Sequence, residues 1–270
     1  MAILNVTPDS FSDGGRYHVP ERAIEHGLKL VAEGADVLDI GGESTRPGAE
    51  PVPETEEIAR VLPVVQTLAR QIAIPISIDT MKAEVARRCL DAGASIIKDV
   101  SGLRHDPAMI SLARETGAGL VVMHMQGMPA TMQQNPQYHD VLGEIEHFFR
   151  ERIATLTMAG IAAEAITLDP GIGFGKTMSH NLTLLANLGR YQRLGRPVVL
   201  GVSRKGVIGT IIARERSERL AGSLAVGCFA VAEGAAQILR VHDVAAHRDA
   251  ALLWEALAPY RLTSRSELPR

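Results

Sequence analysis

Short apolar runs alternate with longer, helix-patterned segments along the whole chain. The runs are residues 3–6, 36–40, 75–79, 95–98, 119–124, 165–169, 197–202 and 236–241. Their apolar residues follow one another instead of alternating with polar ones, which is typical of strands buried on both faces of a parallel sheet. The segments expected to be helical include residues 23–32, 54–69, 83–92, 140–158, 216–232 and 243–257. This alternation predicts an α/β fold.

Polar side chains gather at the downstream ends of most of these runs. They are Asn5, Asp39, Asp79, Lys98, Asp99, His124, Asp169, Lys205, Arg240 and His242. In a closed barrel all strand ends meet at one rim, where active sites are built, whereas in an open doubly wound sheet they lie along a line. No linker or shift of composition divides the chain. The sequence therefore predicts a (β/α)8 TIM barrel, with residues 1–270 as a single domain.

Composition excludes several classes of protein. Hydrophobic residues make up 46% of the chain and charged residues 22%, which argues against disorder. A formal charge of -3 offers no basic surface for nucleic acid or for an acidic membrane. No apolar stretch has the length of a membrane span and no signal segment is recognisable, so we expect a cytoplasmic protein. Cys89 and Cys228 lie among apolar neighbours, which predicts two small buried side chains and no disulfide framework.

Two loops after the first strands are suited to anions and oxygen-bound cations. Residues 5–15 are rich in small hydroxylated residues, acids and glycines, although an ordinary polar loop explains that composition equally well. Residues 41–48 combine glycines, which expose backbone amides, with the guanidinium of Arg46. We therefore expect an anionic substrate group beside Arg46.

Two carboxylates end apolar strands. Asp79 and Asp169 can each accept paired hydrogen bonds from an amidine-like N–H edge, as found on a 2-amino-4-oxo heterocycle. Capping of the helix that follows is an equally simple explanation for either residue. Lys205, Arg240 and His242 follow the seventh and eighth strands, where this class of barrel usually binds phosphate.

Several other kinds of chemistry find no support in the motifs. Residues 169–177 superficially resemble a phosphate-binding loop, but the glycine spacing is too short for a Walker A motif. The histidines lack zinc-site spacing, although ligands from separate strands could still assemble in space. No serine or cysteine occupies a G-x-S-x-G turn, so a covalent acyl mechanism is not indicated.

Six segments together resemble the motifs of the dihydropteroate synthases, in order and at the spacing of that family. They are residues 5–15, 39–48, 77–80, 169–177, 203–205 and 240–243. The resemblance implies a barrel that condenses 6-hydroxymethyl-7,8-dihydropterin diphosphate with p-aminobenzoate, releasing pyrophosphate and 7,8-dihydropteroate in folate biosynthesis. It also implies Mg²⁺ as cofactor, a homodimer and a target of sulfonamides, whereas it is the charge and composition that predict no nucleic-acid or membrane partner.

The resemblance also implies roles for individual residues. Asn5 resembles the magnesium ligand, assisted by Asp13 in the first loop. Thr45 and Arg46 resemble contacts to the diphosphate, and Pro47 resembles a wall of the p-aminobenzoate pocket. The carboxylates of Asp79 and Asp169 and the ammonium of Lys205 resemble the pterin contacts, and Arg240 with His242 resemble the residues that grip the diphosphate. The residues given a catalytic role are Lys205, Arg240, His242 and Asp13, and further substrate contacts are Lys98, Met123, Phe174, Gly201 and Gly206.

The sequence departs from the family pattern in three places. Lys98 stands where the family has asparagine, Gly206 stands where a serine is common, and the family's N-terminal hairpin is not found ahead of Met1. A lysine carries three donors and no acceptor, so it cannot copy the two-way contact of an asparagine. We expect its ammonium to pair with Asp79 or Asp99.

Three other functions remain open from the sequence. A pterin-dependent methyltransferase shares the barrel and the pterin carboxylates, but it has no use for the two anion-binding loops. A non-catalytic pterin-binding paralogue is compatible with Lys98, and it would release no pyrophosphate from the two substrates. A metallohydrolase is a more distant alternative, which stoichiometric zinc would reveal.

Overall fold

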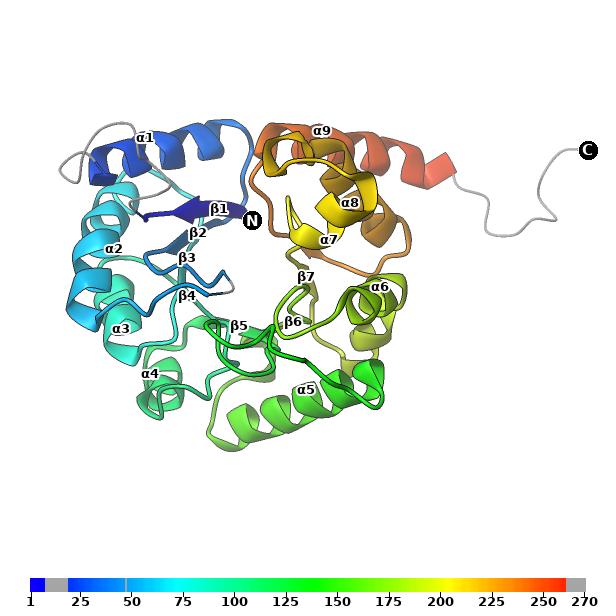
Figure 1. The fold of residues 1–270 in the computed structure, drawn as a ribbon. Coiled ribbons are helices and arrows are strands. Elements are labelled where there is room, and N and C mark those ends of the chain that lie inside the picture. Colours follow the sequence, from blue (N-terminus) through cyan, green and yellow to red (C-terminus); the bar gives the residue numbers. More distant parts are fainter. Residues whose placement is uncertain (8–18, 47, 261–270) are drawn as a thin grey trace, which may run out of the picture.

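Parallel strands and helices alternate in the computed structural model, which describes residues 1–7, 19–46 and 48–260 (Figure 1). The strands in these ranges are β1 (Ala2–Asn5), β2 (Leu38–Gly41), β3 (Ile76–Asp79), β4 (Ile96–Asp99), β5 (Gly119–Met123), β6 (Ile166–Asp169), β7 (Val199–Leu200) and β8 (Ile238–Leu239). Each strand lies within or at the edge of one of the apolar runs. The continuous apolar pattern therefore located all of them.

The strands close into a barrel. Strands β1 to β6 form one parallel sheet in sequence order, and β7 pairs with β8. A bridge between Leu168 and Val198 joins β6 to the segment before β7, and a bridge between Ala2 and Val241 joins β1 to the segment after β8. The amide of Ile3 donates to the carbonyl of Val241 over 2.9 Å at the second seam. The (β/α)8 prediction is confirmed, and the open sheet is excluded.

Helices surround the strands on the outside of the barrel (Figure 1). Their bounds are α1 (Val19–Ala32), α2 (Glu54–Leu68), α3 (Ala83–Asp91), α4 (Ala108–Thr116), α5 (Val141–Met158), α6 (Met178–Ala186), α7 (Gly206–Ile212), α8 (Leu220–Ala232) and α9 (Val244–Leu257). The described ranges also contain four short 3-10 helices: η3 (Ala163–Ala165), η4 (Leu188–Leu194), η5 (Arg216–Glu218) and η6 (Ala258–Tyr260).

The sequence pattern merged or missed some of these helices. The segment expected as one helix over 216–232 is divided into η5 and α8. Helix α7 has seven residues, two of them glycines, which favour a helix poorly, so its spacing gave no signal.

The core lies between the strands and the surrounding helices and consists mostly of aliphatic side chains. Cys89 is buried in it as expected, whereas the prediction for Cys228 is wrong, because this residue is exposed on α8. Apolar neighbours in the sequence indicate that a helical residue is buried only where another helix or strand covers the face of the helix on which the residue lies. No helix of the described ranges is long and apolar enough to cross a membrane.

Candidate active site

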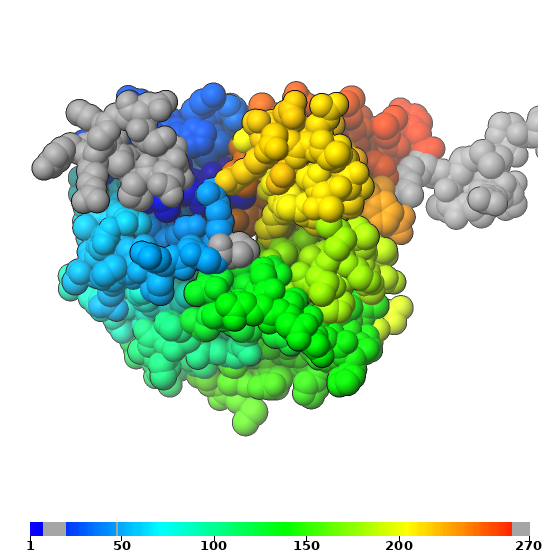
Figure 2. Space-filling view, viewed as in Figure 1, coloured from blue at the N-terminus to red at the C-terminus, as the bar shows by residue number. Residues whose placement is uncertain are grey.

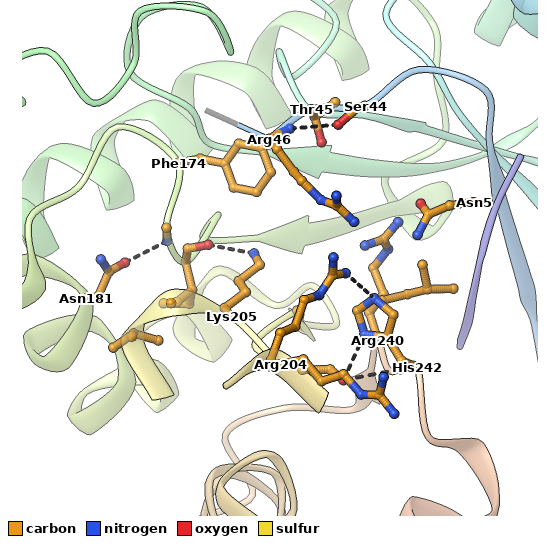
Figure 3. Close-up of a pocket in the computed structure, with 18 of the residues that line it drawn as sticks. Asn5, Ser44, Thr45, Arg46, Phe174, Asn181, Arg204, Lys205, Arg240 and His242 are labelled. Atoms are coloured by element: carbon orange, nitrogen blue, oxygen red, sulfur yellow. Dashed lines mark hydrogen bonds between the residues drawn. The ribbon is translucent and has the colours of Figure 1, made fainter. Parts of the chain in front are cut away.

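A cavity of about 570 Å³ opens at the carboxyl ends of the strands. The segments around it come from distant parts of the sequence, and in Figure 2 segments from the first part (blue), the middle (green) and the later part (yellow) of the chain lie around this end of the barrel. Ten residues singled out from the sequence line the cavity: Asn5, Thr45, Arg46, Asp79, Phe174, Gly201, Lys205, Gly206, Arg240 and His242. Figure 3 shows Asn5, Arg46, Lys205 and His242 pointing toward a common space. The predicted convergence of the strand ends is therefore confirmed.

The other predicted site residues lie elsewhere. Lys98 and Asp169 are buried at the floor of the cavity, where they contact residues that line it. Met123 is 1% exposed and packs in an apolar cluster, so it does not line the cavity. Asp13 and Pro47 lie outside the described residues.

Two acids and two bases form a network at the floor. The Nζ of Lys98 donates to Oδ2 of Asp79 over 2.7 Å, as expected from the sequence. Arg240 joins both acids, with Nη2 2.9 Å from Oδ2 of Asp79 and Nε 2.5 Å from Oδ2 of Asp39. Burial alone would raise the pKa of the fully buried Asp39, but Arg240 and Lys98 outweigh it and hold that pKa below its ordinary value. These charges are therefore fixed before any ligand binds.

Asp169 and Lys205 lie near this network, because the charges of Asp169, Arg240 and Asp79 all act on the ammonium of Lys205. Oδ1 of Asp169 accepts a 2.8 Å hydrogen bond from the amide of Gly171, whereas Oδ2 faces Gly201, whose added Cβ would lie 3.7 Å away. The Nζ of Lys205 donates to the carbonyl of Ile172 over 2.5 Å and lies 4.7 Å from the centre of the Phe174 ring. Burial lowers the pKa of Lys205 to about 7. One oxygen of Asp169 is thus available to a ligand.

The loop after β6 wraps around a buried ammonium that the sequence reasoning missed. The Nζ of Lys176 donates to the carbonyls of Gly171 and Phe174 over 3.0 and 2.9 Å and lies 3.0 Å from Nδ1 of His124. Lys176 is 3% exposed, and burial lowers its pKa to about 7. The sequence pattern of this loop, which lacks Walker A spacing, gave no signal for the buried lysine. Its role is to hold the loop that carries Phe174.

The buried Lys176 predicts a rise in stability with pH. Because its pKa is about 7 when folded and near 10.5 when unfolded, the unfolded chain binds more protons between these values, so the free energy of unfolding increases with pH there. We expect Lys176→Met to lose about 1.4 kcal/mol of stability relative to wild type for each pH unit between 7 and 10. Urea unfolding at pH 7, 8.5 and 10 measures this. The exposed Lys29→Met is the control, and parallel curves for wild type and Lys176→Met would contradict the prediction.

Lys98 occupies one oxygen of Asp79 that a ligand could otherwise use. We expect Lys98→Asn to increase the affinity for the pterin that the resemblance implies by about tenfold at most, equivalent to roughly 1.4 kcal/mol, because Asp79 is released from Lys98 while it still accepts from Arg240, and an amide with both donor and acceptor is gained. Titration calorimetry with a pterin measures the affinity, and Lys98→Met separates the release of Asp79 from the gain of the amide. Loss of all turnover in Lys98→Asn would instead give the lysine a part in the chemistry.

Basic side chains lie close together at the other end of the cavity. Oγ of Ser203 lies 3.0 Å from Nδ1 of His242, and Nη2 of Arg216 lies 3.4 Å from its Nε2. Burial, followed by the charges of Arg216, Arg240 and Arg204, lowers the pKa of His242 to about 3, so the ring is neutral in the absence of a ligand. Arg216 was missed because it was assigned to a helix. A count of the arginines in residues 214–219 was the available signal.

The oxygen ligands near the cavity suit a metal ion that binds together with phosphate groups better than a metal ion that is bound by the protein alone. Among the described residues no three His, Cys, Asp or Glu side chains come together as a metal site. The side chain of Asn5 lines the cavity from the end of β1. Mg²⁺ is usually bound through one or two protein oxygens together with substrate phosphates. This donor set is compatible with such an ion.

The fold and the site together define a class of protein. It is a (β/α)8 barrel with paired charges at the floor of its cavity and a cluster of basic side chains at the carboxyl ends of its strands. Such a site is suited to bind a small molecule with an anionic group.

Known proteins place the chain within this class. Residues 1–242 match the model of the family described as pterin binding enzyme. Dihydropteroate synthase of Escherichia coli is 46% identical over 267 residues, which covers 99% of this chain and 94% of that protein. The Xanthomonas albilineans dihydropteroate synthase solved with 4-aminobenzoic acid has a TM-score of 0.89 and 47% identity, covering 100% of this chain and 93% of that one. The Yersinia pestis enzyme solved with a sulfonamide drug has a TM-score of 0.90 and 43% identity, covering 96% and 94%.

The chain belongs to the pterin-binding enzyme family and, within it, to the dihydropteroate synthases. It is therefore a transferase.

Proposed function

We propose that this chain condenses 6-hydroxymethyl-7,8-dihydropterin diphosphate with p-aminobenzoate, forming 7,8-dihydropteroate and pyrophosphate. The observation that carries this proposal is the polarity of the cavity, with carboxylates at its floor and cations at its outer end. A pterin with its N–H groups at one end and a diphosphate at the other matches that arrangement. Related enzymes from X. albilineans were solved with 4-aminobenzoic acid and with 7,8-dihydropteroate.

The floor of the cavity holds the pterin in this proposal. Each of the two carboxylates uses one oxygen for a contact within the protein: Oδ1 of Asp169 and Oδ2 of Asp79. The other oxygen of each accepts hydrogen bonds from the amino and ring N–H groups of the pterin. Lys205 donates to acceptors of the pterin ring. Its ammonium is already placed by the carbonyl of Ile172 and the ring of Phe174, which reduces the entropy lost on binding.

The outer end of the cavity stabilises the leaving diphosphate. The bond between the exocyclic carbon and the diphosphate oxygen breaks, and its electron pair leaves with the diphosphate. We propose that His242 and Nη1 of Arg240, which is not used in the contacts with Asp39 and Asp79, stabilise this negative charge. The pterin ring delocalises the positive charge on carbon, and the neutral aryl amine attacks that carbon and then loses a proton to water. The protein supplies no nucleophile.

We further propose that Mg²⁺ accompanies the diphosphate, held through Asn5 and, in the first loop, Asp13. The ion would supply neutralisation of phosphate charge. Asn5 lies at the carboxyl end of β1 and lines the same cavity as Arg46 and His242.

The p-aminobenzoate site is proposed beside Phe174, between the loop after β6 and the start of α7. An added Cβ at Gly206 would meet no atom within 4 Å, so the position has space for the serine common in the family. Thr45 and Arg46 line the same cavity as Phe174, and Pro47, which lies outside the described residues, is proposed as a wall of this pocket from the resemblance alone. Because sulfonamides bind the Y. pestis relative, we propose the same class of inhibitor here.

A steady-state assay with both substrates tests the proposed function. We expect pyrophosphate release only when the pterin diphosphate and p-aminobenzoate are both present, and we expect a chelator to reduce it and added Mg²⁺ to restore it. Pterin binding without pyrophosphate release would instead indicate a non-catalytic binding protein.

A second copy of the chain is proposed to cover helices α8 and α9, which pack against each other. Helix α8 contains no charged residue, and a helix that is apolar all round is normally buried. Phe229, Leu253 and Leu257 are 47%, 67% and 60% exposed on these helices. Sedimentation should give a dimer that Leu253→Asp weakens, whereas the same change at the exposed Met158 of α5 should not.

Two further expectations stay predictions from the sequence. Residues 1–270 are proposed to fold as one domain, because the barrel is built from strands along the whole described chain. The cytoplasmic location also remains a prediction.

A further inference from the structure

An arginine outside the barrel strands reaches the outer end of the cavity. Arg216 belongs to η5, the short turn between α7 and α8, and lines the cavity together with Arg46 and His242. Its Nη2 lies 3.4 Å from Nε2 of His242. The charges that act on Arg216 are those of Arg46, Arg204 and Arg219, whereas Asp39, Asp79 and Asp169 act on Arg240, so Arg216 lies at the end of the cavity away from the pterin carboxylates.

The charges around Arg216 are predominantly positive. Burial and the nearby charges of Arg46, Arg204 and Arg219 lower its pKa from the ordinary value. Arg204 is neutralised by Asp243, and the guanidinium of Arg219 donates to backbone carbonyls. Neither Arg216 nor Arg46 forms an ion pair with a carboxylate in the described ranges.

Two like-charged guanidinium groups without counter-ions at the mouth of a cavity indicate a place for an anion. Their repulsion in the empty protein is relieved when a polyanion binds between them, and a guanidinium can donate two parallel hydrogen bonds to a phosphate.

We infer that Arg216 is an additional ligand of the diphosphate and contacts its outer phosphate group. The inference rests on the proposed function, and it adds a residue supplied by the α7–α8 connection. Arg216 favours a pterin diphosphate over a pterin that lacks the diphosphate, because Arg216 lies at the end of the cavity away from the pterin carboxylates and does not reach the pterin ring.

Pyrophosphate binding to the full-length protein tests this inference directly. We expect Arg216→Gln to raise the dissociation constant of pyrophosphate about tenfold in titration calorimetry. Arg214→Gln is the matched control. It removes the same charge from the same segment, but Arg214 is exposed, does not line the cavity, and within the described ranges its guanidinium pairs with Glu218 alone, at 3.9 Å. The control should bind pyrophosphate within about twofold of wild type.

The kinetic constants separate a ligand role from general weakening of the fold. Arg216→Gln should raise KM for the pterin diphosphate and leave KM for p-aminobenzoate and the affinity for a pterin without diphosphate unchanged. Arg216→Lys, which keeps the charge but loses the planar fork, should recover part of the affinity.

Two results would overturn the inference. One is pyrophosphate binding by Arg216→Gln equal to that of wild type, and the other is equal weakening in the Arg214 and Arg216 variants, which would reflect net charge alone. If wild-type protein releases no pyrophosphate from its two substrates, the proposed reaction fails, but the pyrophosphate titration still decides the role of Arg216.

Discussion

Asp169→Asn is expected to lose most of the affinity for the pterin. Oδ1 of Asp169 accepts from the amide of Gly171, so an asparagine retains its oxygen there and turns its NH₂ group toward Gly201 and the ligand. A donor then faces the donor edge of the pterin. Losing one charge-assisted hydrogen bond costs about 1.5–3 kcal/mol, which corresponds to roughly a 10- to 150-fold rise in dissociation constant.

Calorimetric titration with a pterin that lacks the diphosphate measures this loss without the contribution of the cation cluster. Asp91→Asn makes the same chemical change at the exposed end of α3 and should bind as wild type does. Near-unchanged affinity in Asp169→Asn would remove the residue from the pterin site. A parallel loss in Asp79→Asn is expected, although Lys98 and Arg240 already share one of its oxygens.

The barrel was predictable because its signals are local in the sequence. A strand buried on both faces must be apolar along its whole length, and a polar residue such as Asp79 or Asp169 then marks the point where the strand reaches the rim. Strands β7 and β8 are only two residues long, yet their apolar surroundings located them equally well.

Residues that act through tertiary contacts were not predictable in this way. Lys176 contacts His124, which lies 52 positions away in the sequence, and Arg216 contacts His242, which lies 26 positions away. Neither spacing corresponds to a helical or strand period, so no pattern in the sequence links the partners. The pairing of Lys98 with Asp79 was predictable, because adjacent parallel strands place their ends side by side.

Arg240→Met is expected to destabilise the folded protein by about 3–5 kcal/mol, because removal of one partner leaves a buried charge uncompensated. Asp39 is 0% exposed and its Oδ2 accepts from Nε of Arg240, whereas Asp79 retains Lys98. Urea unfolding at pH 8 measures the loss. Arg248→Met, which removes a surface arginine 3.8 Å from Asp36, should cost less than about 1 kcal/mol.

The pH dependence of this loss identifies Asp39 as its cause. In wild type the pKa of Asp39 is held below its ordinary value by Arg240 and Lys98, which together outweigh burial. Without Arg240 burial dominates and should raise that pKa above the unfolded value, so the variant binds a proton more readily when folded and its stability relative to wild type should fall as pH rises from 5 to 8. Adding Asp39→Asn to Arg240→Met removes the charge and should flatten this dependence. If the single variant is equally destabilised at pH 5 and pH 8, the loss comes from packing around Arg240 and not from the buried carboxylate.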